Sequence, residues 1–165
     1  MSTSAPGQVI IDAALVRRMM REGIPFCRKL DADLVEVGPE GATARLPYDE
    51  RLVGNPESGL LHGGVITSLV DTVCGMAVIA ALRVPTVVAT LDLRIDYLKP
   101  AVPGKDLLAT AECYKTTRHI AFVRGLAHHG DRDDPVATCA ATFMIRSSET
   151  TPMAKLAAEQ MANAG

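Results

Sequence analysis

One segment of the sequence, SGLLHGGVITSLVDTVCG, contains the residue types from which a catalytic site can be built. Gly63 and Gly64 follow His62 at the start of an apolar run, where the first turn of a helix would present unpaired backbone N–H groups. Because glycine has no Cβ, a ligand carbonyl can approach those groups closely. The same run contains an acid, Asp71, which is costly to bury unless it is paired or used. The segment therefore predicts a backbone hydrogen-bond donor and a carboxylate that act on a polar substrate group.

The elements around this segment predict an α+β fold with two helices and six strands. The expected elements are a helix over 11–21, strands over 26–37 and 42–46, a long helix over 64–82, and strands over 87–98, 107–116, 120–127 and 136–146. We expect the last four strands to form an antiparallel meander that packs on the long helix. Strict alternation in the strand VVATLDLRIDYL places Thr90 on the polar side with Asp92 and Arg94. We also expect three regions: an N-terminal tail and helix (1–25), one domain (26–147) and a C-terminal tail (148–165).

The composition is typical of a folded domain and gives no sign of nucleic-acid binding. The chain has 165 residues, of which 48% are hydrophobic, and its net charge is −2. It has only 4% aromatic residues and no tryptophan, so nucleic acid is not an expected partner. The four cysteines are widely spaced without a CxxC pair, and the start of the chain does not resemble a signal peptide. We therefore expect free thiols and a cytoplasmic location.

Two further features suggest other kinds of site but have simpler interpretations. The run from Gly63 to Leu82 is long enough to cross a bilayer, yet an aspartate at mid-membrane costs about 2.5–3.5 kcal/mol. We interpret the run as the core helix of a domain that has no membrane partner. The polar cluster HHGDRDD lies where a turn is expected, so it predicts a turn rather than a metal site.

Several of these motifs together resemble the hotdog-fold acyl-CoA thioesterases, the PaaI-like group of the 4-hydroxybenzoyl-CoA thioesterase-type superfamily. The matching pieces are Asn55, the LHGG motif, Asp71 in SLVDTVCG and the strand TLDLRIDYLKPA. HGG alone is weak evidence, but HGG followed by the acid at this spacing and then by this strand is specific. The resemblance implies a hotdog fold, in which a curved antiparallel sheet of about six strands wraps a long central helix. It also implies the hydrolysis of acyl-CoA thioesters.

The resemblance assigns catalytic roles to four residues. The Gly63 N–H would stabilise the oxyanion, and Asp71 would act as nucleophile or general base. Asn55 would orient the carbonyl or the attacking water. Thr90 matches a hydroxyl position that assists the water in relatives, although the strand alternation turns it away from the apolar side. The resemblance implies no metal or redox cofactor. Coenzyme A enters only as part of the substrate.

On the substrate side, His62 and Gly64 would border the thioester, and Gly75 would leave room for the acyl chain. Close packing of the helix on the sheet explains Gly75 equally well. Arg118 is the first candidate to attract the phosphates of coenzyme A, ahead of Arg146 and Lys99.

Three other candidate residues also have structural alternatives. Asp71 could be a structural acid capped by Ser68 or Thr67, which lie one helical turn earlier. Asn55 could be an ordinary turn residue before a proline. His62 could be a catalytic base, but we expect it mainly to shape the start of the helix.

The spacing of Gly63 and Asp71 has a consequence for assembly. Eight residues of helix rise by about 12 Å, whereas an acid and an oxyanion donor must both lie within about 3 Å of one thioester carbon. The two groups of one chain cannot meet this condition. We therefore expect them to come from different subunits of a homodimer, or of a dimer of dimers, as the resemblance also implies.

Two functions of other classes stay open at this point. Hydratases and dehydratases of acyl thioesters share the fold, but they generally pair a catalytic histidine with an acid in a different motif. A non-catalytic acyl-CoA binding module would need neither the acid nor the oxyanion glycine. The sequence favours hydrolysis over both.

Overall fold

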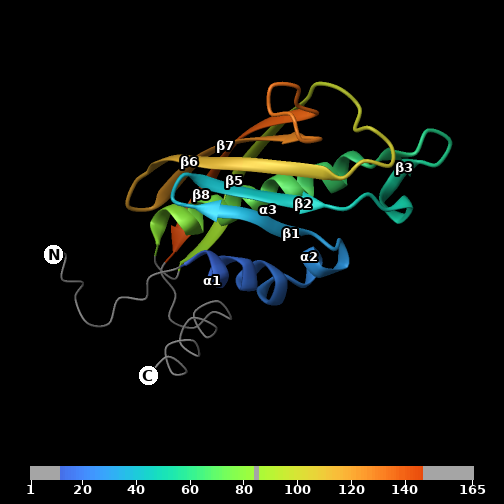
Figure 1. Ribbon diagram of the computed structural model, residues 1–165. Helices are drawn as coiled ribbons and strands as arrows, with labels where there is room; N and C mark the ends of the chain where they lie inside the picture. Colours follow the sequence, from blue (N-terminus) through green and yellow to red (C-terminus); the bar gives the residue numbers. More distant parts are fainter. Residues whose placement is uncertain (1–11, 84–85, 147–165) are drawn as a thin grey trace.

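The computed structural model describes residues 12–83 and 86–146 and is built around a six-stranded antiparallel sheet (Figure 1). Its strands are β1 (Asp33–Gly38), β2 (Gly41–Leu46), β5 (Val87–Tyr97), β6 (Leu107–Thr116), β7 (Ile120–His128) and β8 (Ala137–Arg146). They lie in the order β1-β2-β6-β7-β8-β5. The predicted turn at GPEG joins β1 to β2, and the predicted bounds of β6 are confirmed.

The long helix α3 (Gly63–Leu82) packs against one face of this sheet and touches all six strands (Figure 1). The strands present fully buried alanines to it, among them Ala44 and Ala109, which let the helix approach closely. The buried residues of α3 run from Ile66 to Ala80, and burying a large aliphatic side chain stabilises by roughly 1.5–3 kcal/mol. The predicted α+β architecture, with a long helix on a six-stranded antiparallel sheet, is confirmed.

The surroundings of α3 show that it is a core helix and not a membrane span. The helix is long and apolar enough to cross a membrane, but 61% of its most apolar stretch is buried inside the domain. It is therefore the core helix that the sequence predicts.

The N-terminal segment corrects one prediction. The expected first helix is present as α1 (Ala13–Arg18), capped by Asp12, and continues as a wider turn, η1 (Met19–Gly23). The expected strand over 26–37 is wrong in its first part, because a second helix, α2 (Pro25–Lys29), precedes β1. Proline suits the first position of a helix, where its missing N–H is not needed. Pro25 therefore ends one helix and starts another.

The position of β5 corrects the predicted meander. β6, β7 and β8 are consecutive neighbours as expected, but β5 pairs with β8 at the far edge of the sheet and not with β6. α3 crosses the sheet between β2 and β5, so the chain reaches the opposite edge before it returns through β6.

A β-bulge in β5 changes which side chains face the helix. Thr90 pairs with Phe143 and Asp92 pairs with Thr142, so Leu91 is an extra residue without a partner position. The alternation therefore reverses at Leu91, and Thr90 lies on the side of the helix. The prediction that Thr90 shares the outward face of Asp92 is wrong for this reason.

The region expected to be a loop contains short elements that precede α3. A single 3₁₀ turn, η2 (Glu50–Leu52), leads into β3 (Val53–Asn55), which pairs with β4 (Leu60–Leu61). This small hairpin leads directly into the first turn of α3. The predicted C-terminal tail (148–165) and residues 1–11 lie outside the described residues.

Candidate active site

The start of α3 leaves one backbone donor free. His62 has an extended conformation and caps the helix: its Nδ1 accepts a hydrogen bond of 2.9 Å from the Gly64 N–H. The carbonyl oxygen of His62 accepts from the Val65 N–H, also at 2.9 Å. The Gly63 N–H has no acceptor among the described residues and lies beside a cavity of about 350 Å³. The Gly64 N–H thus has its hydrogen-bond acceptor in the His62 side chain, whereas the Gly63 N–H is left for a ligand.

The carboxylate of Asp71 lies in a second cavity. Its Oδ1 accepts a hydrogen bond of 2.8 Å from the hydroxyl of Thr90. This cavity has a volume of about 410 Å³, and most of its other lining residues are apolar: Ile24, Phe26, Met76, Ile79, Val88 and Phe143. Because of the bulge at Leu91, Thr90 and Asp92 lie on opposite faces of β5, and Thr90 points toward this carboxylate. The sequence identified both residues but placed the Thr90 side chain on the wrong face.

The two hydroxyl groups that could hold Asp71 as a structural acid, those of Thr67 and Ser68, form hydrogen bonds with other groups. The hydroxyl of Thr67 donates to the Gly63 carbonyl at 3.1 Å, and that of Ser68 donates to the Gly64 carbonyl at 2.7 Å. Neither hydroxyl is bonded to Asp71 in the described structure. The structural alternative for Asp71 therefore lacks the partners that it requires.

Gly75 lies on the wall of the Asp71 cavity. A Cβ placed on it would meet Phe143 and Val88 at 3.7 Å, which is an ordinary van der Waals contact. Close packing therefore does not require a glycine here, and its small size instead widens the cavity. Phe26 also borders this cavity, although its side chain is 50% exposed. Phe26 could not be predicted as a site residue from the sequence, because its segment was expected to form a strand.

Two further candidates lie outside both cavities. Asn55 is exposed at the end of β3, where its Oδ1 accepts from the Glu57 N–H at 3.0 Å. Arg118 is exposed in the turn between β6 and β7 and forms no hydrogen bond or ion pair within the described residues. Lys99 does border the Gly63 cavity, where it forms an ion pair with Asp134.

Cys74 lies one helical turn after Asp71, but it is not a candidate nucleophile. Its Sγ lies 3.7 Å from the Sγ of Cys139 on β8, and both side chains are buried. The hydrogen bond with Cys139 and burial raise the pKa of the Cys74 thiol far above its ordinary value. The thiol therefore stays protonated and acts as a core side chain.

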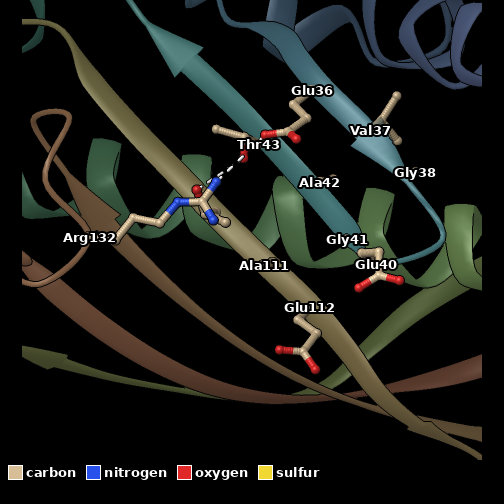
Figure 2. Close-up of a pocket in the computed structure, with 11 residues that line it drawn as sticks. Glu36, Val37, Gly38, Glu40, Gly41, Ala42, Thr43, Ala111, Glu112 and Arg132 are labelled. Carbon is tan, nitrogen blue, oxygen red and sulfur yellow. Dashed lines mark hydrogen bonds and ion pairs between the residues drawn. The ribbon is translucent and has the colours of Figure 1, made fainter.

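A further cavity lies on the other face of the sheet. Its volume is about 420 Å³, and Figure 2 shows its lining on β1, β2 and β6, with α3 behind the strands. Arg132 reaches over it and pairs with Glu36 at 3.6 Å. Because the sheet separates this cavity from Gly63 and Asp71, it is not part of the candidate site. Within 12–83 and 86–146, no group of three His, Cys, Asp or Glu residues is placed to hold a metal ion.

Comparisons with known proteins show which family this chain resembles. The model of the thioesterase superfamily matches residues 58–136, the part that contains Gly63, Asp71 and Thr90. The medium/long-chain acyl-CoA thioesterase YigI of Salmonella typhimurium is 31% identical over 146 residues, which span 79% of this chain and 92% of that protein. Acyl-coenzyme A thioesterase 13 of Mus musculus is 32% identical over 65% of this chain and 75% of its own length. The crystal structure of a Pseudomonas aeruginosa protein is 41% identical, with a TM-score of 0.73, and the match covers 81% of this chain and 98% of that one.

Proposed function

Since this chain belongs to the thioesterase superfamily, we propose that it hydrolyses acyl-CoA thioesters to a free carboxylic acid and coenzyme A. The chain is an enzyme, a thioester hydrolase, and the proposal concerns its substrate and mechanism. One observation carries the proposal: the Asp71 carboxylate, held by Thr90, faces an apolar cavity of about 410 Å³. A carboxylate beside an apolar chamber is what the attack on an acyl thioester requires.

The chemistry follows from the two groups. The Gly63 N–H donates to the thioester oxygen as the carbonyl carbon becomes tetrahedral, and such a donor stabilises the transition state by about 2.7–4 kcal/mol. Asp71 either activates a water for attack on that carbon or attacks it directly to form an anhydride that water then cleaves. The thiolate of coenzyme A leaves and takes up a proton. Thr90 donates to one carboxylate oxygen, so the other is directed to the reaction. Asn55 accepts from the Glu57 N–H with its Oδ1, so its amide N–H groups are left to orient the carbonyl or the water.

The proposed site is shared between two copies of the chain. Gly63 and Asp71 line different cavities and are separated by about 12 Å of helix axis. The edge strand β5 pairs only with β8 in the described chain, and Leu91 and Tyr97 on it are 53% and 50% exposed. A long edge strand with exposed apolar side chains is a surface that a second copy would cover. We therefore propose a homodimer, or a dimer of dimers, in which each site combines Gly63 of one subunit with Asp71 of the other.

The substrate follows from the lining of the cavities. The apolar lining of the Asp71 cavity favours an aliphatic or aromatic acyl group, and the name of the Salmonella relative favours medium and long chains. Arg118 is the proposed contact for the phosphates of coenzyme A. All four cysteines are free, which is typical of a reducing compartment, and we place the enzyme in the cytoplasm.

A substrate panel tests the proposed function. The purified protein is incubated with coenzyme A esters of short, medium, long and aromatic acids, and thiol release is followed with a thiol reagent. We expect release from at least one ester and a loss of about 10²–10⁴-fold in Asp71→Asn. Asp92→Asn is the matched control, because it removes an exposed carboxylate that lies on the outer face of β5 and borders neither cavity.

Other outcomes would contradict the proposal. A change in the unsaturation of the acyl chain without free coenzyme A would indicate a hydratase or dehydratase. Tight binding of the esters without turnover would indicate a binding module. An Asp71→Asn variant as active as the wild type would remove Asp71 from the mechanism.

A further inference from the structure

The first turn of α3 has a property that conflicts with its proposed use. A donor that stabilises a developing charge is effective when it is held in place before the reaction. Gly63 and Gly64, which give a ligand access to the backbone, also have the greatest backbone freedom of any residue type. The order of this turn must therefore come from side chains around it.

Tyr97, the last residue of β5, supplies such a side chain. Its hydroxyl donates to the Gly63 carbonyl at 2.8 Å and lies 2.7 Å from the hydroxyl of Thr67. Thr67 itself donates to the same carbonyl at 3.1 Å. A Cβ placed on Gly63 would lie 3.4 Å from the Tyr97 hydroxyl oxygen, so the ring lies directly against this residue. These contacts join the start of the core helix to the edge strand.

The peptide unit between Gly63 and Gly64 is consequently held at both ends. Tyr97 and Thr67 bind its carbonyl oxygen, and the Nδ1 of His62 accepts its N–H at 2.9 Å. With this peptide plane fixed, the remaining freedom of Gly63 is small. We propose that Tyr97 is a positioning residue, whose hydroxyl orients the Gly63 N–H toward the thioester oxygen through the Gly63 carbonyl. The inference rests on the proposed function, because it assigns Tyr97 a role in the same reaction.

The surroundings of Tyr97 separate this role from a merely structural one. Its side chain is 50% exposed within one chain and borders the Gly63 cavity, outside the buried core, and Tyr97→Phe retains the ring that a second copy would cover. Removal of its hydroxyl therefore leaves no buried polar group and no cavity in the core. The loss should be seen in the rate and hardly in the stability of the fold.

Tyr97→Phe keeps the ring and removes the hydroxyl. With the best ester of the panel we expect kcat to fall about tenfold, the value of one net hydrogen bond, while KM stays unchanged. Thr67→Val removes the second hydroxyl without changing the shape of the side chain and should act in the same direction. Thr67→Ser retains the hydroxyl and should recover the rate. Tyr114→Phe is the matched control, because Tyr114 contacts Phe122 and Arg124 and borders neither cavity.

The outcomes distinguish this inference from the proposed function. If the wild type releases coenzyme A and Tyr97→Phe has kcat within about twofold of it, the inference is overturned and the function stands. An increase in KM at constant kcat would make Tyr97 a substrate contact and would also overturn the inference. If Tyr97→Phe lowers Tm by more than about 2–4 °C, Thr67→Val and Thr67→Ser decide the question. A wild type without thiol release overturns the proposed function and, with it, this role.

Discussion

At the residue scale, Gly63 can be replaced by a residue that has no N–H and that suits the local backbone. His62 has φ −64° and ψ 134°, the extended conformation that a residue before proline prefers. Proline is also favoured at the first position of a helix, which Gly63 occupies. We therefore expect Gly63→Pro to fold normally and to lower kcat by about 10²–10³-fold. Steady-state kinetics and thermal unfolding of the variant test both expectations.

Gly63→Ala is the control for this substitution. It keeps the N–H and adds only a Cβ, which would lie 3.4 Å from the Tyr97 hydroxyl oxygen. We expect a modest loss of activity. Equal activities of the proline and alanine variants would exclude the Gly63 N–H as the oxyanion donor.

A second prediction at this scale concerns pH. His128 is buried at the end of β7, where its Nε2 lies 3.2 Å from the hydroxyl of Thr110 and its Nδ1 accepts from the Gly130 N–H at 3.0 Å. Burial lowers the pKa of His128 below its ordinary value of 6.5, and the charges of Arg132 and His129 lower this pKa further. The unfolded chain thus binds this proton at a higher pH than the folded protein does.

The contribution of His128 to stability is therefore complete above about pH 6.5 and is lost as the pH falls through the folded-state pKa. We expect the free energy of unfolding, measured with urea between about pH 5 and 8, to decrease on the acid side. His128→Gln should flatten this decrease. His119→Gln, at an exposed histidine in the β6–β7 turn, serves as the control. The same slope in His128→Gln and in the wild type would assign the decrease to other groups.

At the scale of the elements, the bulge in β5 can be removed without reversing any face. Because Thr90 already pairs with Phe143 and Asp92 with Thr142, deletion of Leu91 leaves a regular ladder. The deletion straightens the strand beside Asp71, and bulges next to active sites commonly aim a side chain. We expect the variant to keep its circular dichroism spectrum and Tm but to lose most of its kcat. Full activity after the deletion would mean that the bulge does not aim Thr90.

The same elements define how far the sequence alone could predict the fold. The bounds of β6 followed from its extended pattern between two turn signals, and most of α3 followed from its long apolar run, which is buried on all sides from Val73 to Ala80. Pro25 was read only as a helix end, although proline also suits a helix start, so α2 was missed. The place of β5 beside β8 depends on pairings between distant residues, which no local pattern contains.

Only some residues of the candidate site could be predicted from the sequence. Gly63 and Asp71 could be proposed because their residue types are unusual in an apolar helix. Thr90 was placed on the wrong face, since the extra residue Leu91 has no signature in an alternating pattern. Phe26 and Tyr97 were missed because their roles depend on contacts with α3 from other parts of the chain.

At the scale of the whole molecule, the shared site predicts complementation between inactive variants. Gly63→Pro and Asp71→Asn should each be inactive alone. A heterodimer of the two contains one site in which both groups are intact, so two differently tagged copies purified together should have about half of the wild-type activity. The measurement is the specific activity of the tandem-purified heterodimer. Activity no higher than that of the separate variants would place both groups in one chain, or in no common site.

The position of α3 in the chain matters during synthesis, because most of the sheet that covers the helix is made after it. Only β1 and β2 of the main sheet precede the helix in the chain, whereas β5, β6, β7 and β8 follow it. When α3 leaves the ribosome, the nascent chain therefore exposes a segment as apolar as a membrane span before most of its cover has been made. Exposed apolar surface of this kind promotes aggregation. Truncation before Arg146 should thus yield insoluble protein, and chaperone demand during translation should peak between Leu82 and the completion of β8.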